Sequence, residues 1–344
     1  MNPRWMIYGA NGYTGELIAR AGAGDERPIL AGRNSERINA LARELGCEAR
    51  VFDVHRPRLE GVSLVLHCAG PFIHTSAPMV RACLDAGVHY LDITGEIDVF
   101  ETIMALDDEA KRRGVTLLPG VGFDVVPTDC LAAMLAQRLP DANDLMLAFQ
   151  GGAGLSAGTL KTIALGLGDG GAIRRDGRIV RVPMAYDVRD VPFPSGSRTC
   201  MTIPWGDVAT AWYSTGIPNI RVYRASSGRA IARLRRLRLL FPLAAFPPIR
   251  WLMTRAASRA KGPSAEDRRQ GRMELWGRVA NQAGREASIT MSTPEAYAFT
   301  VLSAIAAVKR VLNEPARGGS FTPSMRLGAD FVTSIPGVTF DNKR

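Results

Sequence analysis

The sequence is poor in several residue types, and each shortage argues against a class of protein. Its 344 residues hold five cysteines, odd in number, scattered and never in a C-x-x-C pair. We therefore expect reduced thiols in a cytoplasmic protein rather than a disulfide framework. The four histidines show no zinc-ligand spacing and complete no Ser/His/Asp set, so no metal site is expected. We also expect no signal peptide, because Met1 leads directly into a strand-like segment.

Acidic residues are absent from one stretch, and this absence accounts for the net charge of +10. Residues 221–262 contain eleven Lys or Arg and no Asp or Glu, whereas the rest of the chain is almost neutral. The basic character is local, so it describes one segment and does not indicate a nucleic-acid-binding protein.

Short apolar runs alternate with helical patterns along the first 140 residues, which is typical of a parallel sheet built from βαβ units. The expected strands are Trp5–Tyr8, Pro28–Ala31, Ala49–Phe52, Ser63–His67, Tyr90–Ile93 and Thr116–Leu118. Helices are expected near Gly15–Ala21, Glu36–Leu45, Ala77–Ala86 and Val99–Arg112, and a fifth is expected over Pro127–Arg138. The first four should end in left-handed caps at Gly22, Gly46, Gly87 and Gly114.

The pattern changes near Asp144, where short strands with few helices favour a second α+β domain with a mixed or antiparallel sheet. Its expected elements are strands at Asp144–Gln150, Arg178–Val182, Thr199–Ile203 and Val208–Tyr213 and a helix at Gly158–Leu167. The predicted fold class is α/β, a doubly wound Rossmann sheet followed by this domain. The predicted boundaries are 1–140, 141–290 and 291–344, the last holding a helix at Ala296–Leu312 and a tail returning to the first domain.

A glycine-rich turn follows the first expected strand. Residues Gly9-Ala10-Asn11-Gly12-Tyr13-Thr14-Gly15 have the spacing G-x-x-G-x-x-G and open a helix. The first glycine permits a tight turn, the second lets the backbone approach a pyrophosphate, and the third lets helix and strand pack closely. The helix N-terminus then offers free N–H groups to the phosphates, so the turn predicts a dinucleotide site.

The end of the second strand indicates which dinucleotide binds. An NAD site usually has Asp or Glu there, whereas this chain has Arg33-Asn34 after Gly32. A guanidinium pairs with a 2′-phosphate that a carboxylate would repel, so NADP(H) is the expected cofactor. Asp53, after the third strand, is an adenine-side candidate, although an exposed turn aspartate is the competing interpretation.

Several motifs together resemble the saccharopine-dehydrogenase-like oxidoreductases, including their trans-acting enoyl reductase branch. These motifs are Tyr8–Gly15 (YGANGYTG), Ala31–Arg33 (AGR), Cys68–Phe72 (CAGPF), His89–Glu96 (HYLDITGE) and Gly122–Asp129 (GFDVVPTD). The resemblance implies an NADP(H) Rossmann domain, a second domain with a mixed sheet, and a C-terminal segment that returns to the first domain. We expect the backbone of Ala69, Gly70 and Pro71 to lie beside the nicotinamide, and Cys68, Ala69 and Gly70 are cofactor-binding candidates.

Hydride transfer also needs a group that gives or takes a proton. The candidates are His74, Glu96, Asp124 and Tyr213, each with a structural alternative. His74 could be a surface residue, Tyr213 a core residue in a strand, and Asp124 and Glu96 could cap the helices that follow them. The sequence predicts an NADP(H)-dependent oxidoreductase acting on a C=C, C=O or C=N bond of a hydrophobic or acyl substrate.

The basic stretch at residues 228–260 leaves two interpretations open. Its longest uncharged run, Leu239–Ile249, has eleven residues and three prolines, too few to cross a bilayer. It could lie against a membrane surface, or pack as a lid or against a partner in a homodimer. The alternative function is therefore a catalytically silent NADP-binding protein that docks on a membrane or a partner.

Overall fold

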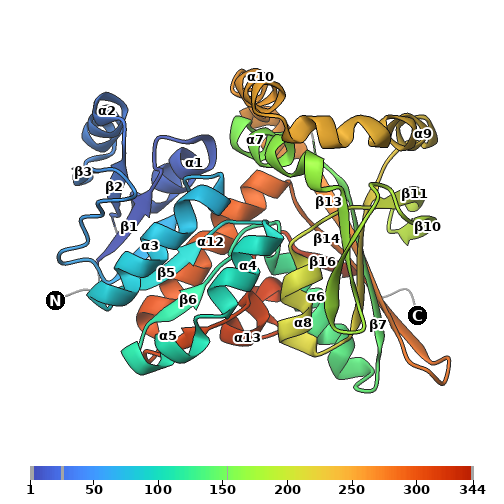
Figure 1. The fold of residues 1–344 in the computed structure, drawn as a ribbon. Helices are drawn as coiled ribbons and strands as arrows, with labels where there is room; N and C mark the ends of the chain where they lie inside the picture. Colours follow the sequence, from blue (N-terminus) through green and yellow to red (C-terminus); the bar gives the residue numbers. More distant parts are fainter. Residues whose placement is uncertain (1–3, 25–26, 153, 342–344) are drawn as a thin grey trace. The chain divides into compact units, whose positions relative to one another are not determined.

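The computed structural model describes residues 4–24, 27–152 and 154–341, which fall into two compact units (Figure 1). The first unit comprises residues 1–126 and 299–327, and the second comprises 127–298 and 328–344. These divisions differ from the expected boundaries at 140 and 290. Residues 127–138 join the second unit, and only the middle part of the segment 291–344 returns to the first.

The first unit contains a seven-stranded sheet in which every strand pairing is parallel. Its order is β3-β2-β1-β4-β5-β6-β15. The first six strands have the order of a doubly wound dinucleotide fold, which confirms the predicted Rossmann sheet. The strands are β1 (Trp5–Tyr8), β2 (Ile29–Gly32), β3 (Ala49–Val51), β4 (Leu64–His67), β5 (His89–Asp92), β6 (Thr116–Leu118) and β15 (Gly319–Ser320).

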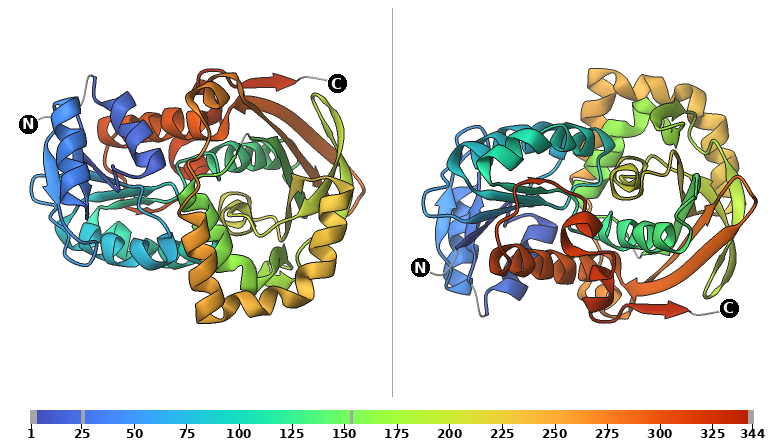
Figure 2. Two further views of the ribbon diagram at one scale, coloured as in Figure 1. Left: turned by 90° about the horizontal axis from the view of Figure 1, so that it is seen from above. Right: turned by 90° about the horizontal axis from the view of Figure 1, so that it is seen from below.

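Helices cover both faces of this sheet, and Figure 2 shows α3 and α4 on one face and α1 and α12 on the other. Strands β1, β2, β4 and β6 are buried along their whole length, as expected for a sheet covered on both sides. The helices are α1 (Tyr13–Gly22), α2 (Ser35–Leu45), α3 (Phe72–Ala86), α4 (Ile97–Met104), α5 (Asp107–Arg113), α13 (Pro323–Leu327) and most of α12 (Ala296–Asn313).

Three local predictions for this unit are wrong. The helix expected over Val99–Arg112 is two helices, because the chain breaks at Ala105–Leu106 before the acidic start of α5. Gly46, Gly87 and Gly114 do form left-handed caps, but α1 ends on Ala23 in a right-handed conformation and Gly22 is its last helical residue. Helix α3 begins at Phe72, five residues before the expected start.

The second unit contains a nine-stranded mixed sheet with the main order β10-β11-β12-β7-β13-β14-β16. Strands β12 and β7 are parallel and the other pairings are antiparallel, which confirms the mixed sheet. Its strands are β7 (Asp144–Gly151), β8 (Gly171–Arg175), β9 (Arg178–Val182), β10 (Val188–Phe193), β11 (Gly196–Thr202), β12 (Asn219–Ala225), β13 (Arg272–Ala280), β14 (Glu286–Pro294) and β16 (Thr339–Asp341).

One predicted strand of this unit is a helix. Residues Val208–Tyr213 lie in α8 (Asp207–Thr215), which ends on Gly216 in a left-handed cap. The alternation Val-Ala-Thr-Ala resembles a strand, but positions 207–211 are all buried, so the alternation does not mark an exposed and a buried face. The other helices are α6 (Val126–Arg138), α7 (Ala157–Gly166), η1 (Leu167–Asp169), α9 (Gly228–Leu237), η2 (Arg238–Ala245), α10 (Pro247–Ala257), α11 (Ala265–Gln270) and η3 (Phe331–Ser334).

Helix α12 is long and apolar enough to cross a membrane by length and composition alone. Its contacts within the first unit are those of a core helix. The Ser303 hydroxyl donates to the Val121 carbonyl at 2.8 Å, and the Phe299 ring meets Phe123 edge to face. The Thr300 hydroxyl accepts a hydrogen bond from the Phe123 N–H at 3.0 Å. Helix α12 therefore anchors the loop that follows β6.

Candidate functional site at the carboxyl edge of the first sheet

The glycine turn after β1 adopts the conformation that its spacing predicts. Gly9 has a φ of +89°, and its N–H donates to the Ala31 carbonyl of β2 at 2.8 Å. A Cβ on Gly15 would lie 2.2 Å from the Gly9 carbonyl oxygen, so only glycine allows this approach of α1 to the turn. The N-cap of α1 is Gly12, which has no side chain to satisfy the first-turn N–H groups. A diphosphate at this end of α1 would meet the positive end of the helix dipole.

The glycine turn lies directly against the loop that follows β4. A Cβ on Gly9 would lie 2.8 Å from both the Cβ and the amide nitrogen of Ala69. The Cys68 N–H donates to the Tyr8 carbonyl at 2.7 Å, which fixes the start of the same loop. Because the strand order reverses between β1 and β4, this is the crevice where a doubly wound sheet binds its ligand. Ala69 and Gly70 thus lie where the nicotinamide half of a dinucleotide would extend.

Arg33 follows β2 at the opposite side of the turn. It is exposed and forms no ion pair with any residue in the described parts of the chain. Burial, and to a smaller extent the negative charge of Asp53, raises the pKa of Tyr8 to about 12, while the positive charge of Arg33 opposes this rise. Arg33 and Asp53 therefore both lie near the Tyr8 hydroxyl, and the Arg33 guanidinium is free to meet a 2′-phosphate.

The other residues expected on this side have structural partners. The Asn34 carboxamide oxygen accepts the Arg37 N–H at 2.9 Å and caps α2. The Asp53 carboxylate accepts the N–H of His55 at 3.0 Å and orders its own turn. A Cβ on Gly32 would lie 2.9 Å from the Asn11 side-chain oxygen, so Asn11 lies over the end of β2. Tyr13 and Thr14 open α1 with partly exposed side chains. Their cofactor contacts stay predictions.

A buried histidine supports the Cys68–Gly70 loop, and the sequence analysis did not single it out for this role. His67 is fully buried at the end of β4, and burial lowers its pKa to about 3, so the ring is neutral. Its Nε2 lies 3.0 Å from the Thr75 hydroxyl, which donates to the Ala69 carbonyl at 2.7 Å. Thr75 therefore connects the buried ring to the backbone beside the glycine turn. No local pattern marks this pair, because the two residues lie on a strand and the next helix.

Three carboxylates lie at the end of β5 or in the loops after β5 and β6, and they differ in role. Asp92 is fully buried, and it accepts the N–H groups of Thr94 and Gly120 at 2.9 and 2.8 Å and the Tyr90 hydroxyl at 2.8 Å. Burial raises the pKa of Asp92 to about 6, while these three donors oppose the shift. Asp92 is therefore a structural carboxylate that holds the loop after β6 against the end of β5.

Glu96 caps a helix other than the one expected. It stands at the N-cap of α4, but its side chain makes no capping bond there. Its two carboxylate oxygens instead accept the N–H groups of Phe72 and Ile73, each at 2.8 Å. The carboxylate thus satisfies the first turn of α3, where a negative charge is also favourable. The suggestion that Glu96 caps its own helix is wrong.

Asp124 is the candidate whose surroundings best fit a proton donor. Its carboxylate lies beside Gly95, since a Cβ on that glycine would be 2.8 Å from Asp124 Oδ2. It makes no hydrogen bond with any of the described residues and keeps part of its surface accessible. Burial, followed by the negative charge of Glu96, raises the pKa of Asp124 to about 7. Asp124 can therefore hold or release a proton near neutral pH.

The remaining two candidates are His74 and Tyr213. His74 is exposed on the first turn of α3, and its N–H donates to the Pro71 carbonyl. Tyr213 is a partly buried residue of α8 in the second unit, not a strand residue as expected. Their catalytic roles stay predictions.

Comparison with known families bears on this site directly. Residues 5–118 match the family model described as the saccharopine dehydrogenase NADP binding domain. The cofactor is therefore NADP(H), as predicted from the glycine turn and Arg33. The match ends on β6, immediately before the loop that carries Asp124.

Curated relatives and a solved structure extend the comparison. A trans-acting enoyl reductase of Mycobacterium leprae is 34% identical over 148 residues, which cover 39% of this chain and 35% of the relative. One of Mycobacterium tuberculosis is 33% identical over 147 residues, with the same shares. The chain thus spans about a third of the length of these relatives. A saccharopine dehydrogenase structure from Saccharomyces cerevisiae aligns over 99% of both chains, with a TM-score of 0.64 and 11% identity, and shares the fold.

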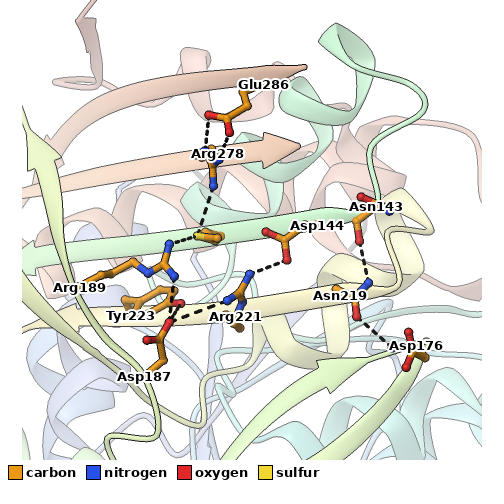
Figure 3. Close-up of polar contacts among 11 residues, drawn as sticks. Asn143, Asp144, Asp176, Asp187, Arg189, Asn219, Arg221, Tyr223, Arg278 and Glu286 are labelled. Carbon is orange, nitrogen blue, oxygen red and sulfur yellow. Dashed lines mark hydrogen bonds and ion pairs between the residues drawn. The ribbon is translucent and has the colours of Figure 1, made fainter. Parts of the chain in front are cut away.

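A second polar cluster lies on the sheet of the second unit (Figure 3). Arg221 of β12 and Arg278 of β13 flank Met146 of β7 in register, and Arg189 of β10 lies over the Tyr223 ring at 5.2 Å. Each arginine has a carboxylate partner, in the pairs Arg221–Asp144, Arg278–Glu286 and Arg189–Asp187. The charges are balanced within the cluster, so we interpret it as a network that fixes strand register.

Proposed function

We propose that this protein is an NADP(H)-dependent oxidoreductase that reduces a polarised C=C bond in an acyl substrate. Reduction of C=O and C=N bonds is compatible with the same residues. The observation that carries the proposal is a carboxyl group with a pKa of about 7 beside the end of β5, on the edge where a doubly wound sheet binds its ligand. The names of the enoyl reductase relatives support the choice of a C=C bond.

The residues of the first unit have separate tasks in this reaction. The Gly9–Gly15 turn binds the diphosphate, and Arg33 selects the 2′-phosphate. Ala69 and Gly70 leave room beside the turn for the ring that carries the hydride. The bound cofactor supplies that hydride, and its addition to the β-carbon leaves negative charge on the α-carbon and the carbonyl oxygen.

Asp124 is the proposed general acid. Its proton neutralises the charge that develops on the substrate, and solvent then reprotonates the carboxylate. A pKa of about 7 suits this task, because the group is protonated often enough to donate and is still acidic enough to release its proton. Glu96 is a positioning residue, since its charge helps to keep Asp124 protonated while its carboxylate holds α3.

The test is hydride transfer from NADPH deuterated at C4 of the nicotinamide. A panel of enoyl thioesters, ketones and imines is incubated with the protein, and deuterium in the product is located by mass spectrometry. We expect stereospecific transfer to an enoyl thioester. Asp124→Asn should lower kcat by about 10²- to 10⁴-fold without a matching change in NADPH affinity. Asp108→Asn, an exposed carboxylate of α5, is the matched control.

Two results would count against the proposal. Absence of NADPH binding would remove its basis. Tight NADPH binding with no deuterium transfer to any substrate class would instead favour the alternative, a catalytically silent NADP-binding protein that docks on a membrane or a partner.

A further inference from the structure

Helices α9, η2 and α10 form one continuous segment of the second unit, residues 228–257, which we call the arm (Figure 1). From Leu237 to Leu252 a large apolar residue stands at every third position, and these six residues are exposed by 39% to 62%. A 3₁₀ helix has three residues per turn, so side chains three positions apart lie on the same side of it. The members on η2 or directly beside it, Leu237, Leu240, Leu243 and Phe246, therefore form a single row. The set is Leu237, Leu240, Leu243, Phe246, Ile249 and Leu252.

Along η2 and α10, the packing of the arm is the reverse of that of an ordinary surface helix. Helix α10 packs against α7 and η2 packs against η1, yet the side chains buried there are small ones such as Ala244 and Ala257. Trp251 is 60% exposed, and Leu240 and Leu252 are exposed by 55% and 62%, whereas Ile231 of α9 is buried. A contiguous exposed apolar strip of this kind marks a surface that contacts something else.

The charge of the arm indicates what that partner is. The arm carries seven arginines and no acidic residue. Arg229, Arg233 and Arg236 line an open groove of about 440 Å³ along α9, together with Ala232 and Leu237. None of these three arginines forms an ion pair within the described ranges of the chain. They are therefore available to an external anion, next to the beginning of the apolar row.

We propose that the arm docks this protein on the surface of an anionic phospholipid bilayer. The three arginines of the groove meet phosphate headgroups, while the apolar row and Trp251 enter the boundary between headgroups and acyl chains. A homodimer through the same surface is less favourable, because a two-fold axis would place two clusters of seven like charges together. The proposal concerns a surface of the second unit and does not depend on the proposed reaction.

The experiment uses the full-length protein and sedimentation with sucrose-loaded vesicles. One vesicle is pure phosphatidylcholine and the other contains 30% phosphatidylglycerol. We expect binding to the anionic vesicle that weakens by about tenfold or more between 0.05 and 0.5 M NaCl, because salt screens headgroup charge. Trp251 fluorescence should shift to shorter wavelength on binding, and Trp251→Phe should remove that shift.

Two variants separate the charge and the apolar contributions. Arg229→Gln/Arg233→Gln/Arg236→Gln should reduce anionic-vesicle affinity by about tenfold or more. Leu240→Asn/Leu243→Asn should reduce the affinity for anionic vesicles at high salt, because the apolar contacts with the bilayer remain when salt screens the charges. The control Arg112→Gln/Arg198→Gln/Lys309→Gln removes three exposed charges outside the arm and should keep most of the binding. Circular dichroism and NADPH affinity report whether each variant is folded.

Other outcomes would overturn the proposal. These are absence of vesicle binding, equal affinity for neutral and anionic vesicles, or binding that both arm variants leave unchanged. Light scattering that shows a dimer dissociated by Leu240→Asn/Leu243→Asn, without vesicle binding, would assign the surface to a second copy. Salt-sensitive binding to single-stranded DNA but not to vesicles would assign the arginines to nucleic acid.

Discussion

The carboxylate of Glu96 accepts the backbone N–H of Phe72 at 2.8 Å, although the two residues are 24 positions apart in the sequence. The negative charge of the same carboxylate helps to raise the pKa of Asp124. One side chain therefore determines where α3 begins and influences the protonation of the candidate acid.

Replacing Glu96 should affect both properties. Glu96→Gln removes the charge and one of the two good acceptors at the start of α3, so we expect a loss of about 1 kcal/mol in the free energy of unfolding. The pKa of Asp124 should fall as well. Urea unfolding and carboxyl-carbon NMR measure the two effects. Glu60→Gln changes an exposed carboxylate and is the control; equal stability of both variants would argue against the cap.

Arg33 should discriminate between the two dinucleotides. Arg33→Asp is expected to weaken NADPH binding by more than tenfold, about 1.4 kcal/mol, and to affect NADH far less, because only NADPH carries a 2′-phosphate. Calorimetry with both cofactors measures the ratio. Arg43→Asp, which makes the same charge change on α2, is the control. Equal losses for both cofactors at position 33 would contradict a contact with the 2′-phosphate.

The protonation of Asp124 predicts a pH dependence of reduction. As the general acid it is active when protonated, so kcat/KM should fall about tenfold per pH unit above about 7. Asp124→Asn should abolish this fall of kcat/KM above about pH 7, and Asp108→Asn should leave the fall unchanged. A profile that is flat between pH 6 and 9 would remove Asp124 from the proton transfer.

The same group makes the free energy of unfolding depend on pH. The folded pKa of about 7 exceeds the usual 3.8, so between these values the folded state holds more protons than the unfolded state. The stabilisation is complete below about pH 3.8 and is lost as the pH rises through about 7. Asp124→Asn should therefore gain roughly 1–2 kcal/mol relative to the parent at pH 8 and less than half of that at pH 5, because the loss begins near pH 3.8 and is complete above about 7. Urea unfolding at the two pH values measures this difference.

Gly15 should tolerate no side chain. Gly15→Ala places a Cβ 2.2 Å from the Gly9 carbonyl oxygen, so the turn must shift. We expect a loss of about 1–3 kcal/mol in stability and of measurable NADPH binding. Gly166→Ala, at the exposed end of α7 with no atom within 4 Å of its added Cβ, should change neither. A Gly15→Ala protein that binds NADPH normally would contradict this account of the turn.

Thr75 should act on the cofactor through the Ala69 backbone. Thr75→Val keeps the side-chain shape but removes the hydroxyl between His67 and the Ala69 carbonyl. We expect NADPH affinity to fall by about three- to tenfold, roughly the value of one hydrogen bond. Thr102→Val removes a comparable hydroxyl from α4 and is the control. Unchanged affinity in Thr75→Val would show that the loop holds its position without this link.

The sequence by itself determined the dinucleotide domain, because its signals are local. The spacing of Gly9, Gly12 and Gly15 predicts the turn because the steric limits of the backbone act within seven residues. The position of Arg33 at the end of β2 predicts the preference for NADP(H) in the same local way. The left-handed caps at Gly46, Gly87 and Gly114 are also local, so they were predicted correctly.

Only the tertiary structure decided the rest, because the deciding contacts join residues far apart in the chain. The start of helix α3 at Phe72 is stabilised by the carboxylate of Glu96, which lies 24 residues away and is therefore outside any short stretch of sequence around Phe72. Residues 208–213 alternate like a strand but lie in a helix in which residues 208–211 are all buried. Burial depends on neighbours distant in the chain, which a local sequence pattern does not contain. The pKa of Asp124 likewise depends on burial and on Glu96, so its suitability as an acid became visible only in the fold.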